Sequence, residues 1–558
     1  MVWWAGLFLQ PAAWGCSAST GGDAGGAEDA GVDTMDGTGD VDQDRVETED
    51  GDRDGDGDAE DAVDDGTSGD SRPNIVVVMT DDQTLADLRV MTATQRLVGD
   101  AGTSFDTFYI PYALCCPSRA TFLTGQHCHN HGVLYNKLPT GGYTRLDHDN
   151  TLAVWLEAAG YATVHIGKYL NGYGRDAPST GEEVPPGWTE WYGTVGGSTY
   201  RMYDYTVNDD GVLVDFGFDA ADYQTDVLAA EAEAVVRRLA PQDRPFFLWF
   251  CPLAPHREEG VTKDYEKGTL VDVTEIPPLP PGGRDASDAR RRRPPTPKGP
   301  FDYPGNPRPA PRHEGVFADE ALPRPPSFNE ADLSDKADVL ASELPLLRPA
   351  QIVQLEIDYR ARLESLLAVD EAVARIVAAL EEAGEIDRTV LMFTSDNGYF
   401  LGEHRHTSKY LPYEEGIHVP LMIRGPGFPP GLHVASPVAN VDLAPTIAAL
   451  AGAVPGIDVD GISLLDVRTD PAAFDGRTIL LGAGENSDGL PIYHGIRVPG
   501  WTYLEWESGD VELYDLAADP FQIDSAHDLP GLATRRAELA ALLGGLRGCA
   551  GAACFGLP

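Results

Sequence analysis

Residues 75–82 read Ile-Val-Val-Val-Met-Thr-Asp-Asp, and this stretch decides the fold class. Its apolar residues follow one another without the polar alternation of a half-exposed strand. Such a run is typical of a strand that is buried on both faces, as in a parallel sheet. Asp81 and Asp82 then stand at the carboxyl end of the strand, where ligands bind in open α/β sheets.

The same pattern recurs along the chain. Further apolar runs that lead into polar or glycine residues occur at 162–166, 245–250, 390–393 and 420–423. Between them, helical patterns occur at 152–159, 227–239, 352–383 and 443–451. Strands that alternate with helices predict an α/β fold, a mostly parallel sheet sandwiched by helices.

The pattern of apolar and turn residues changes after about residue 471. Short strand patterns separated by turn residues occur at 478–481, 492–497, 501–507 and 511–514, and a helical pattern follows at 532–546. They predict a smaller antiparallel sheet with a helix. We therefore expect a main domain at 73–470 and a C-terminal α+β subdomain at 471–558. Residues 261–347 are rich in Pro and Arg and predict an insertion over or beside the functional site.

The chain of 558 residues carries a formal charge of −48, much of it in a Gly/Asp/Glu-rich segment. Residues 21–72 hold few large apolar side chains, so we expect a disordered tether there. The charge disfavours nucleic acid as a partner, because phosphates would be repelled. The basic run Arg290–Arg293 is interpreted as a solvated loop.

The first 20 residues resemble a leader. Residues 1–15 are apolar and too short to span a bilayer, and they are similar to a secretion signal without its usual basic start. Residues 13–16 resemble a bacterial lipoprotein cleavage site with Cys16 as the lipidated residue, and a plain signal peptide is the alternative. Either predicts an exported protein, which is periplasmic, at the cell surface or secreted.

The other cysteines and the closely spaced histidines are interpreted as structural residues. In an exported chain, Cys549 and Cys554 are expected to form a disulfide around a small loop. Cys128 and Cys251 are expected to be buried thiols. The stretch 127–131, Cys-His-Asn flanked by histidines, is too closely spaced for the usual zinc pattern and is interpreted as a polar loop at the pocket rim.

Residues 115–119 read Cys-Cys-Pro-Ser-Arg, and 123–125 read Leu-Thr-Gly. Pro117 suits the first turn of a helix, which would place Cys115 and Cys116 at a helix N-terminus. That end of a helix favours anions, and Arg119 adds a planar donor fork that suits a tetrahedral oxyanion.

These residues are similar to the signature of the formylglycine-dependent sulfatases, which belong to the alkaline phosphatase-like superfamily. The resemblance implies that a separate maturation enzyme oxidises Cys115 to Cα-formylglycine. One position departs from the pattern, because Gln126 stands where the family usually has Arg or Lys. Whether Cys115 is matured in this chain is therefore left open.

The resemblance also implies a metal site. Asp81, Asp82, Asp396 and Asn397 match the family's ligands, and an oxygen of the modified Cys115 completes the shell. Carboxylate and amide oxygens suit Ca²⁺ or Mg²⁺ better than zinc. Calcium is the more usual metal of the family.

The matching catalytic positions are Arg119, Lys168, His256 and Lys409. Arg119 and the two lysines would hold the sulfate oxygens. One hydroxyl of the hydrated aldehyde would attack sulfur, and the other would later expel sulfate. His256 is the expected general acid, with Lys409 as a second candidate. Leu170 stands where many sulfatases have a histidine, so that histidine's role is not transferred.

The motifs are nearest to sulfatases that act on N-acetylglucosamine-6-sulfate in heparan-type glycans, and aryl sulfates are expected artificial substrates. A phosphate or phosphonate ester hydrolase on the same fold is one alternative. Another is a surface lipoprotein that binds sulfated glycan without catalysis. A redox role for Cys115 and Cys116 is disfavoured, because adjacent cysteines do not form the Cys-x-x-Cys pair.

The first prediction concerns the tryptic peptide 97–119 from protein made in its native host. We expect its mass to match formylglycine at Cys115 with Cys116 still a thiol. Mass spectrometry with fragment sequencing distinguishes the two positions. An unmodified Cys115 in folded, metal-loaded protein would favour the binding-protein alternative.

Overall fold

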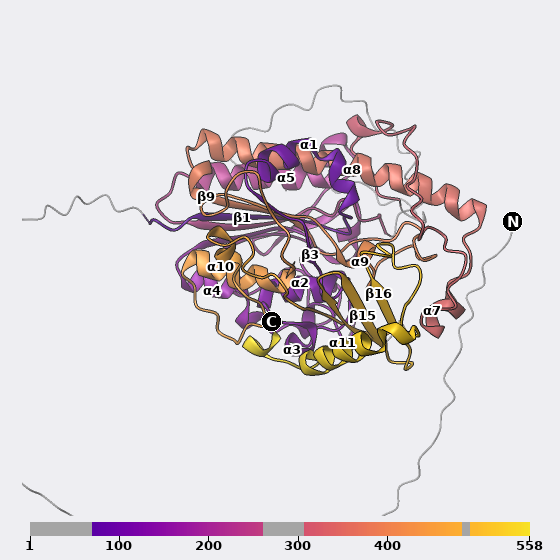
Figure 1. Cartoon of the computed structure of the whole chain (residues 1–558). Helices are drawn as coiled ribbons and strands as arrows, with labels where there is room; N and C mark the ends of the chain where they lie inside the picture. The colour runs from indigo at the N-terminus through magenta and orange to yellow at the C-terminus, as the bar shows by residue number, and fades with distance from the viewer. Residues whose placement is uncertain (1–69, 260–305, 483–491, 558) are drawn as a thin grey trace, which may run out of the picture. The chain divides into compact units, whose positions relative to one another are not determined.

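A ten-stranded sheet organises the chain in the computed structural model, which describes residues 70–259, 306–482 and 492–557 (Figure 1). Its strands lie in the order β11 (Leu432–Val434), β2 (Thr103–Phe105), β10 (Leu421–Arg424), β9 (Thr389–Ser395), β1 (Asn74–Thr80), β8 (Phe246–Cys251), β4 (Ala162–Gly167), β5 (Glu190–Thr194), β6 (Thr206–Asp209) and β7 (Val212–Asp215).

The centre of the sheet is parallel. Strand β1 pairs in parallel with β9 on one side and β8 on the other, and β4 and β5 continue the parallel set. Towards the edges, β10 runs antiparallel to β9, and β6 and β7 form an antiparallel hairpin. The predicted mostly parallel α/β class is confirmed, and the short edge strands were not predicted.

Strand β1 shows why the apolar run forms the centre. Val76 and Val78 pack into the core on one face, whereas Ile75, Val77 and Met79 pack into the core on the other. Successive strand residues point to opposite faces, so a run without alternation fills both cores.

Helices cover both faces of the sheet (Figure 1). One layer contains α1 (Thr92–Thr94), α5 (Gln224–Leu239) and the long α8 (Pro349–Glu382). The other contains α2 (Cys115–Thr124), α4 (Leu152–Ala158) and α10 (Leu443–Ala451). The shorter elements are α3 (Cys128–His131), α7 (Asp338–Glu343), α9 (Glu414–Ile417) and the strand pair β3 (Phe108–Tyr109) and β12 (Val438–Ala439). Among the described residues, no helix is long and apolar enough to cross a membrane.

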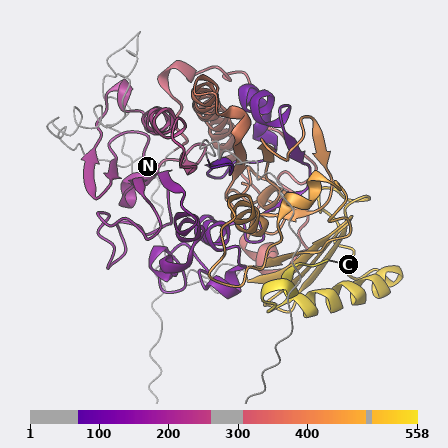
Figure 2. The same cartoon turned by 90° about the vertical axis from the view of Figure 1, so that its left-hand side faces the viewer.

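The C-terminal part forms a four-stranded antiparallel sheet, as predicted (Figure 2). Its strands are β13 (Ile479–Gly482), β14 (Tyr493–Val498), β15 (Trp501–Trp506) and β16 (Val511–Asp515), and α11 (Ala533–Leu546) packs on β14 and β15. Tyr493 and Tyr514 share an apolar cluster with Tyr109 and Tyr410 of the main part. The division at 470/471 stays a prediction.

The predicted insertion is partly described. Residues 306–347 include α7, and Asn329 N–H donates to the Gly402 carbonyl at 2.7 Å while His404 N–H donates to the Ser327 carbonyl at 2.7 Å. This part of the insertion therefore lies against the loop that follows β9. Residues 1–69, with Cys16 and most of the tether, lie outside the described residues, as does Arg290–Arg293.

Two predictions, for the segment around residues 128–131 and for the burial of Cys128, need correction. Residues 128–131 are not a loop, because they form the one-turn helix α3 next to α2. Cys128 is only half-buried, whereas Cys251 is fully buried. The Cys549–Cys554 disulfide is present as expected.

A buried ion pair connects α10 to the C-terminal segment. Asp442 accepts from Arg477 at 2.6 and 2.9 Å, and Arg477 Nε also donates to the Phe555 carbonyl at 2.7 Å. Both side chains are almost completely buried. Removing one partner leaves the other charge buried and uncompensated.

We expect R477A to lower the free energy of unfolding by about 3–5 kcal/mol. The matched control is R237A, which breaks an exposed pair with Glu233 and should cost less than about 1 kcal/mol. Thermal or urea unfolding of both variants measures the difference. Equal losses would show that the buried pair does not hold this segment.

Candidate active site

Polar side chains from separate segments meet at the carboxyl end of the central strands. These segments follow strands β1, β9, β4 and β8 or belong to the first turns of helix α2. The residues that meet are Asp81, Asp82, Asp396, Asn397, Lys168, His256, Cys115, Arg119 and Lys409. All of these residues are buried except Lys409, whose side chain has 11% of its surface exposed to solvent. The structure thus brings every predicted site residue into one cluster.

The backbone after two strands adopts special conformations. Gly167, the residue before Lys168, has φ +103°, and a Cβ there would lie 2.1 Å from the Cys251 carbonyl oxygen. Only glycine fits this approach between β4 and β8. Asp82 has φ +67°, and its backbone is held because its N–H donates to Asp396 Oδ1 at 3.1 Å and its carbonyl accepts from Arg362.

Helix α2 is fixed to the end of β9 by Ser118. The Ser118 hydroxyl donates to the Asp396 carbonyl, and Asn440 Nδ2 donates to the Ser118 hydroxyl at 2.9 Å. This chain of hydrogen bonds sets the position of Cys115 at the start of the helix relative to Asp396.

Two lysines contact the aspartates that follow β1. Lys168 Nζ donates to Asp81 Oδ2, and Lys409 Nζ donates to Asp82 Oδ1 at 2.5 Å. Lys409 Nζ also lies 2.7 Å from Cys115 Sγ, which in turn is 3.6 Å from Asp81 Oδ1. The thiol therefore stands between a cation and a carboxylate.

Arg119 is the fully buried cation of the cluster that contacts Asp396 and Lys168. Its Nε donates to Asp396 Oδ2 at 2.8 Å, and its Nη1 donates to the Lys168 carbonyl at 2.6 Å. Its Nη2 has no hydrogen-bond partner within the described ranges and lies 3.8 Å from Asp81 Oδ2. The guanidinium thus fixes Asp396 and keeps one donor available.

The charges set the protonation states. Burial alone would raise the pKa of Asp81, but attraction by Lys168, His256 and Lys409 outweighs it, and the pKa is lowered. Burial likewise works against the charge of Lys168, but Asp81 raises its pKa overall. Burial raises the pKa of the Cys115 thiol despite the two lysines. Cys115 is therefore a neutral thiol near pH 7, which is a weak nucleophile.

His256 faces the same aspartates. Its Nδ1 lies 2.6 Å from the Arg257 carbonyl, which can only accept, so Nδ1 carries a proton. Its Nε2 points to Asp82 Oδ2 at 3.6 Å and is the ring atom that can exchange a proton. Burial lowers the pKa of His256 more than Asp81 and Asp82 raise it.

The cluster has the composition of a cation site. Donor atoms of Asp81, Asp82, Cys115 and His256 lie within 4.8 Å of one another. Asn397 donates its amide N–H to Asp82 Oδ1 at 2.7 Å, and its own buried Oδ1 has no hydrogen-bond partner among the described residues. A buried acceptor oxygen beside two carboxylates fits a hard divalent cation. Both oxygens of Asp396 instead accept from Asp82 N–H and Arg119.

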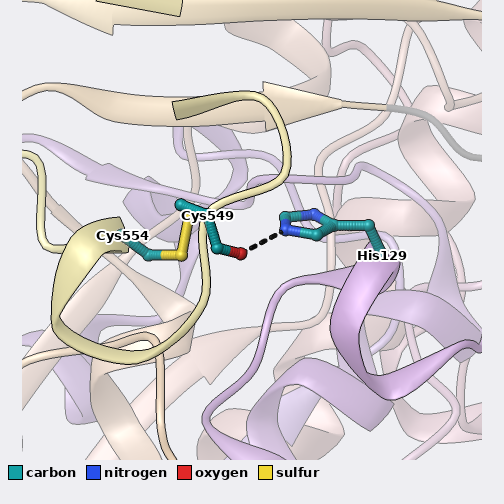
Figure 3. Close-up of side chains that lie close together, drawn as sticks. All are labelled: His129, Cys549 and Cys554. Carbon is teal, nitrogen blue, oxygen red and sulfur yellow. Dashed lines mark hydrogen bonds between the residues drawn. A yellow bond between two sulfur atoms is a disulfide. The ribbon is translucent and has the colours of Figure 1, made fainter. Parts of the chain in front are cut away.

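A second group of metal-ligand side chains proves to be structural. His129, Cys549 and Cys554 lie close together, but the two sulfurs form the disulfide (Figure 3). His129 Nε2 hydrogen-bonds the Cys549 carbonyl at 2.9 Å, and Asn130 Nδ2 donates to the same oxygen. This contact attaches α3 to the C-terminal loop.

The loop that carries Lys409 is strained and externally supported. Tyr410 has φ +97°, which is unfavourable for a bulky side chain. Its carbonyl accepts a hydrogen bond from the Tyr493 hydroxyl of β14 at 2.9 Å. The C-terminal sheet thus stabilises the backbone next to Lys409.

Three residues at the site were not predicted from the sequence: Arg362, Asn440 and Tyr200. Arg362 lies in the middle of α8, and from the sequence it cannot be distinguished from an ordinary solvent-facing helix residue. Tyr200 ends a short 3₁₀ helix, Gly196–Tyr200. Local sequence carries no signal for such residues, because only the tertiary fold brings them to the site.

Comparisons with known proteins identify the family of the chain. The family model "Sulfatase" matches residues 73–453, and the model of the C-terminal part of N-sulphoglucosamine sulphohydrolase matches residues 402–547. The chain belongs to the sulfatase family. It is a sulfuric ester hydrolase by this membership.

Individual relatives cover most of this sulfatase. The N-acetylglucosamine-6-sulfatase of Homo sapiens is 31% identical over 501 residues, which covers 82% of this chain and 81% of the relative. An arylsulfatase of Volvox carteri is 32% identical over 534 residues, with 87% and 76% covered. A protein solved with its substrate D-glucosamine-2-N,6-O-disulfate has a TM-score of 0.63 at 24% identity, covers 85% of this chain and 97% of its own, and supports the fold.

The two departures from the family pattern have local explanations. Gln126 Nε2 donates to the Asp458 carbonyl at 2.9 Å just after α2. Leu170 is buried in the apolar core, and the next residue, Asn171, donates to the Tyr200 hydroxyl at 2.6 Å. Polar contact with the site wall thus comes from Asn171 rather than from position 170.

We expect K409A to lower kcat/KM for an aryl sulfate by about 10²–10³-fold, because it removes a cation that lies beside Cys115. The matched control is R96A, which removes a cation from the exposed Arg96 and should leave kcat/KM unchanged. Steady-state assays with melting curves check both. A K409A enzyme with normal turnover would exclude Lys409 from the chemistry.

Proposed function

We propose that this sulfatase removes sulfate from sulfated sugars of the N-acetylglucosamine-6-sulfate type, using formylglycine at Cys115 and a divalent metal. The observation that carries the proposal is the contact set of Cys115, whose Sγ lies 2.7 Å from Lys409 Nζ and 3.6 Å from Asp81 Oδ1. A nucleophile there stands beside both the anion-binding cations and the acidic cluster.

Modification of Cys115 supplies what the thiol lacks. The hydrated aldehyde provides a hydroxyl that takes the sulfuryl group and a second hydroxyl that releases it. Support comes from the raised pKa of the buried thiol, which makes it a poor nucleophile as it stands. Helix α2 and the Ser118 contact to the Asp396 carbonyl hold the position of this residue.

The acidic residues are proposed to hold the cation. Asp81, Asp82, Asp396 and Asn397 offer oxygen donors, which favours Ca²⁺ over softer metals, with Mg²⁺ as the alternative. A cation held by these residues would polarise a sulfate oxygen and offset the negative charge of the site. The partnerless Asn397 Oδ1 supports this assignment.

Lys168, Lys409 and Arg119 are proposed to bind the sulfate oxygens. In the structure the two lysines neutralise Asp81 and Asp82. With a divalent cation on the same carboxylates, the two ammonium groups would be able to bind an anion. Arg119 Nη2 is a further donor that is free for hydrogen bonding within the described residues.

His256 is proposed as the general acid for the leaving oxygen, together with Lys409. Because its Nδ1–H is held by the Arg257 carbonyl, proton exchange takes place at Nε2. Burial lowers the pKa of His256, which makes its imidazolium a stronger acid but leaves a smaller fraction of it protonated near pH 7.

The substrate class rests on the relatives. A human N-acetylglucosamine-6-sulfatase at 31% identity over most of both chains supports a sulfated sugar. The leader at residues 1–20, with Cys16 as a candidate lipid anchor, supports export towards a polymer that does not enter the cell. The separate catalytic domain at 73–470 and C-terminal subdomain at 471–558 belong to the same proposal.

The test uses protein coexpressed with a formylglycine-generating enzyme. We expect sulfate release from N-acetylglucosamine-6-sulfate and from 4-nitrophenyl sulfate, and much slower release of phosphate from the matching aryl phosphate. C115A should be inactive, whereas C116A should retain most activity. Aryl sulfate turnover without release from any sulfated sugar would refute the substrate class.

Metal removal provides a separate prediction. Dialysis against a chelator should abolish turnover, because the acidic cluster loses the cation that polarises the sulfate. Ca²⁺ should restore activity, and the concentration needed is read from a titration followed by turnover and by melting temperature. Full activity after exhaustive chelation would contradict the metal assignment.

A further inference from the structure

Tyr200 is a buried residue on the wall of the site that carries no role in the chemistry described so far. It ends the 3₁₀ helix Gly196–Tyr200, and only 7% of its surface is exposed. Its carbonyl accepts from Glu259 N–H at 2.9 Å, and Gln224 Nε2 donates to the carbonyl of the preceding Thr199 at 3.1 Å. The backbone that carries the ring is thus held from two sides.

The ring of Tyr200 contacts two of the proposed catalytic residues at once. Lys168 Nζ lies over the ring at 5.0 Å from its centroid, and the imidazole of His256 lies at 5.1 Å with an interplanar angle of 43°. An ammonium over an aromatic face is attracted by the ring quadrupole. The same ring limits the orientations open to the imidazole.

Asn171 fixes the ring in turn. Its Nδ2 donates to the Tyr200 hydroxyl at 2.6 Å. Asn171 follows Lys168 closely along the chain, so one short segment carries both the cation and the residue that orients the ring beneath it. Lys168, Tyr200 and Asn171 therefore form a closed set of contacts next to His256.

We propose that Tyr200 is a positioning residue that holds Lys168 and His256 in their mutual arrangement for transfer of the sulfuryl group. This inference rests on the proposed function. Lys168 binds a sulfate oxygen, whereas His256 serves the leaving oxygen on the other side of the S–O bond. A rigid aromatic ring in contact with both side chains fixes the distance between the Lys168 ammonium and the His256 imidazole.

The inference predicts a dependence on the leaving group. An ester whose alcohol is a weak acid needs a proton on the leaving oxygen as the S–O bond breaks, whereas 4-nitrophenolate leaves without one. Loss of the ring displaces His256, so it should slow phenyl sulfate much more than 4-nitrophenyl sulfate. A general loss of folded protein would slow both esters equally.

The experiment compares Y200L and Y200F in formylglycine-bearing enzyme. We expect Y200L to lower kcat for phenyl sulfate by about 100-fold and for 4-nitrophenyl sulfate by less than about 10-fold, with small changes in KM. Y200F keeps the ring but loses the hydroxyl that accepts from Asn171, so it should slow phenyl sulfate by less than about 10-fold. Should Y200L not fold, Y200M carries the same test with an unbranched side chain that fills the space.

The matched control is Y205L. Tyr205 is also buried in the same core, and its ring stacks on that of Phe216 with 4.9 Å between the centroids. Its loss should lower the melting temperature without changing the ratio of the two kcat values.

Two results would overturn the inference. If Y200L slows both esters by the same factor, or if Y200F is as slow as Y200L, the ring does not hold His256 in place for proton transfer to the leaving oxygen, and the inference fails. If wild-type enzyme with formylglycine releases sulfate neither from these esters nor from N-acetylglucosamine-6-sulfate, the proposed function fails and this inference fails with it. Activity of the wild type therefore separates the two failures.

Discussion

The site depends on the neutralisation of buried charge. Asp81, Asp82 and Asp396 have almost no solvent exposure, and a buried carboxylate without a partner is very unfavourable. Lys168, Lys409 and Arg119 supply the partners, each from a different segment of the chain. The fold therefore brings these segments together at the end of the sheet, and the requirement for charge balance explains why the groups that suit an anion stand beside groups that suit a cation.

The sheet provides the rigid support for this balance. Strand β1 packs into apolar cores on both faces, so the aspartates that follow it start from a fixed position. The approach of Gly167 to the Cys251 carbonyl and the left-handed backbone of Asp82 then direct the chain into the site. These local conformations are unfavourable for most residues, and the packing around them maintains the geometry.

Sequence was sufficient where function depends on local patterns. The apolar runs predicted the central strands, and the Cys-Cys-Pro-Ser-Arg stretch predicted the start of α2. The resemblance to the formylglycine-dependent sulfatases, together with the polar residues after strands, predicted which side chains would meet. It failed for edge strands such as β7, whose residues are mostly exposed and carry no apolar run. It also missed Arg362, Asn440 and Tyr200, because their neighbours at the site lie far away in the chain. The assignment as a loop was wrong for residues 128–131, which form α3. Among the contacts of this helix is the carbonyl of Cys549, more than 400 positions later in the chain.

The hydrogen bond from Tyr493 to the Tyr410 carbonyl joins the C-terminal sheet to the strained backbone beside Lys409. The two parts of the chain are therefore structurally coupled at this point. A substitution in β14 that alters this contact changes the placement of a lysine in the site, although it lies in a different sheet. An exchange of the C-terminal sheet between relatives is therefore expected to preserve turnover only if the loop that carries Lys409 is exchanged with it.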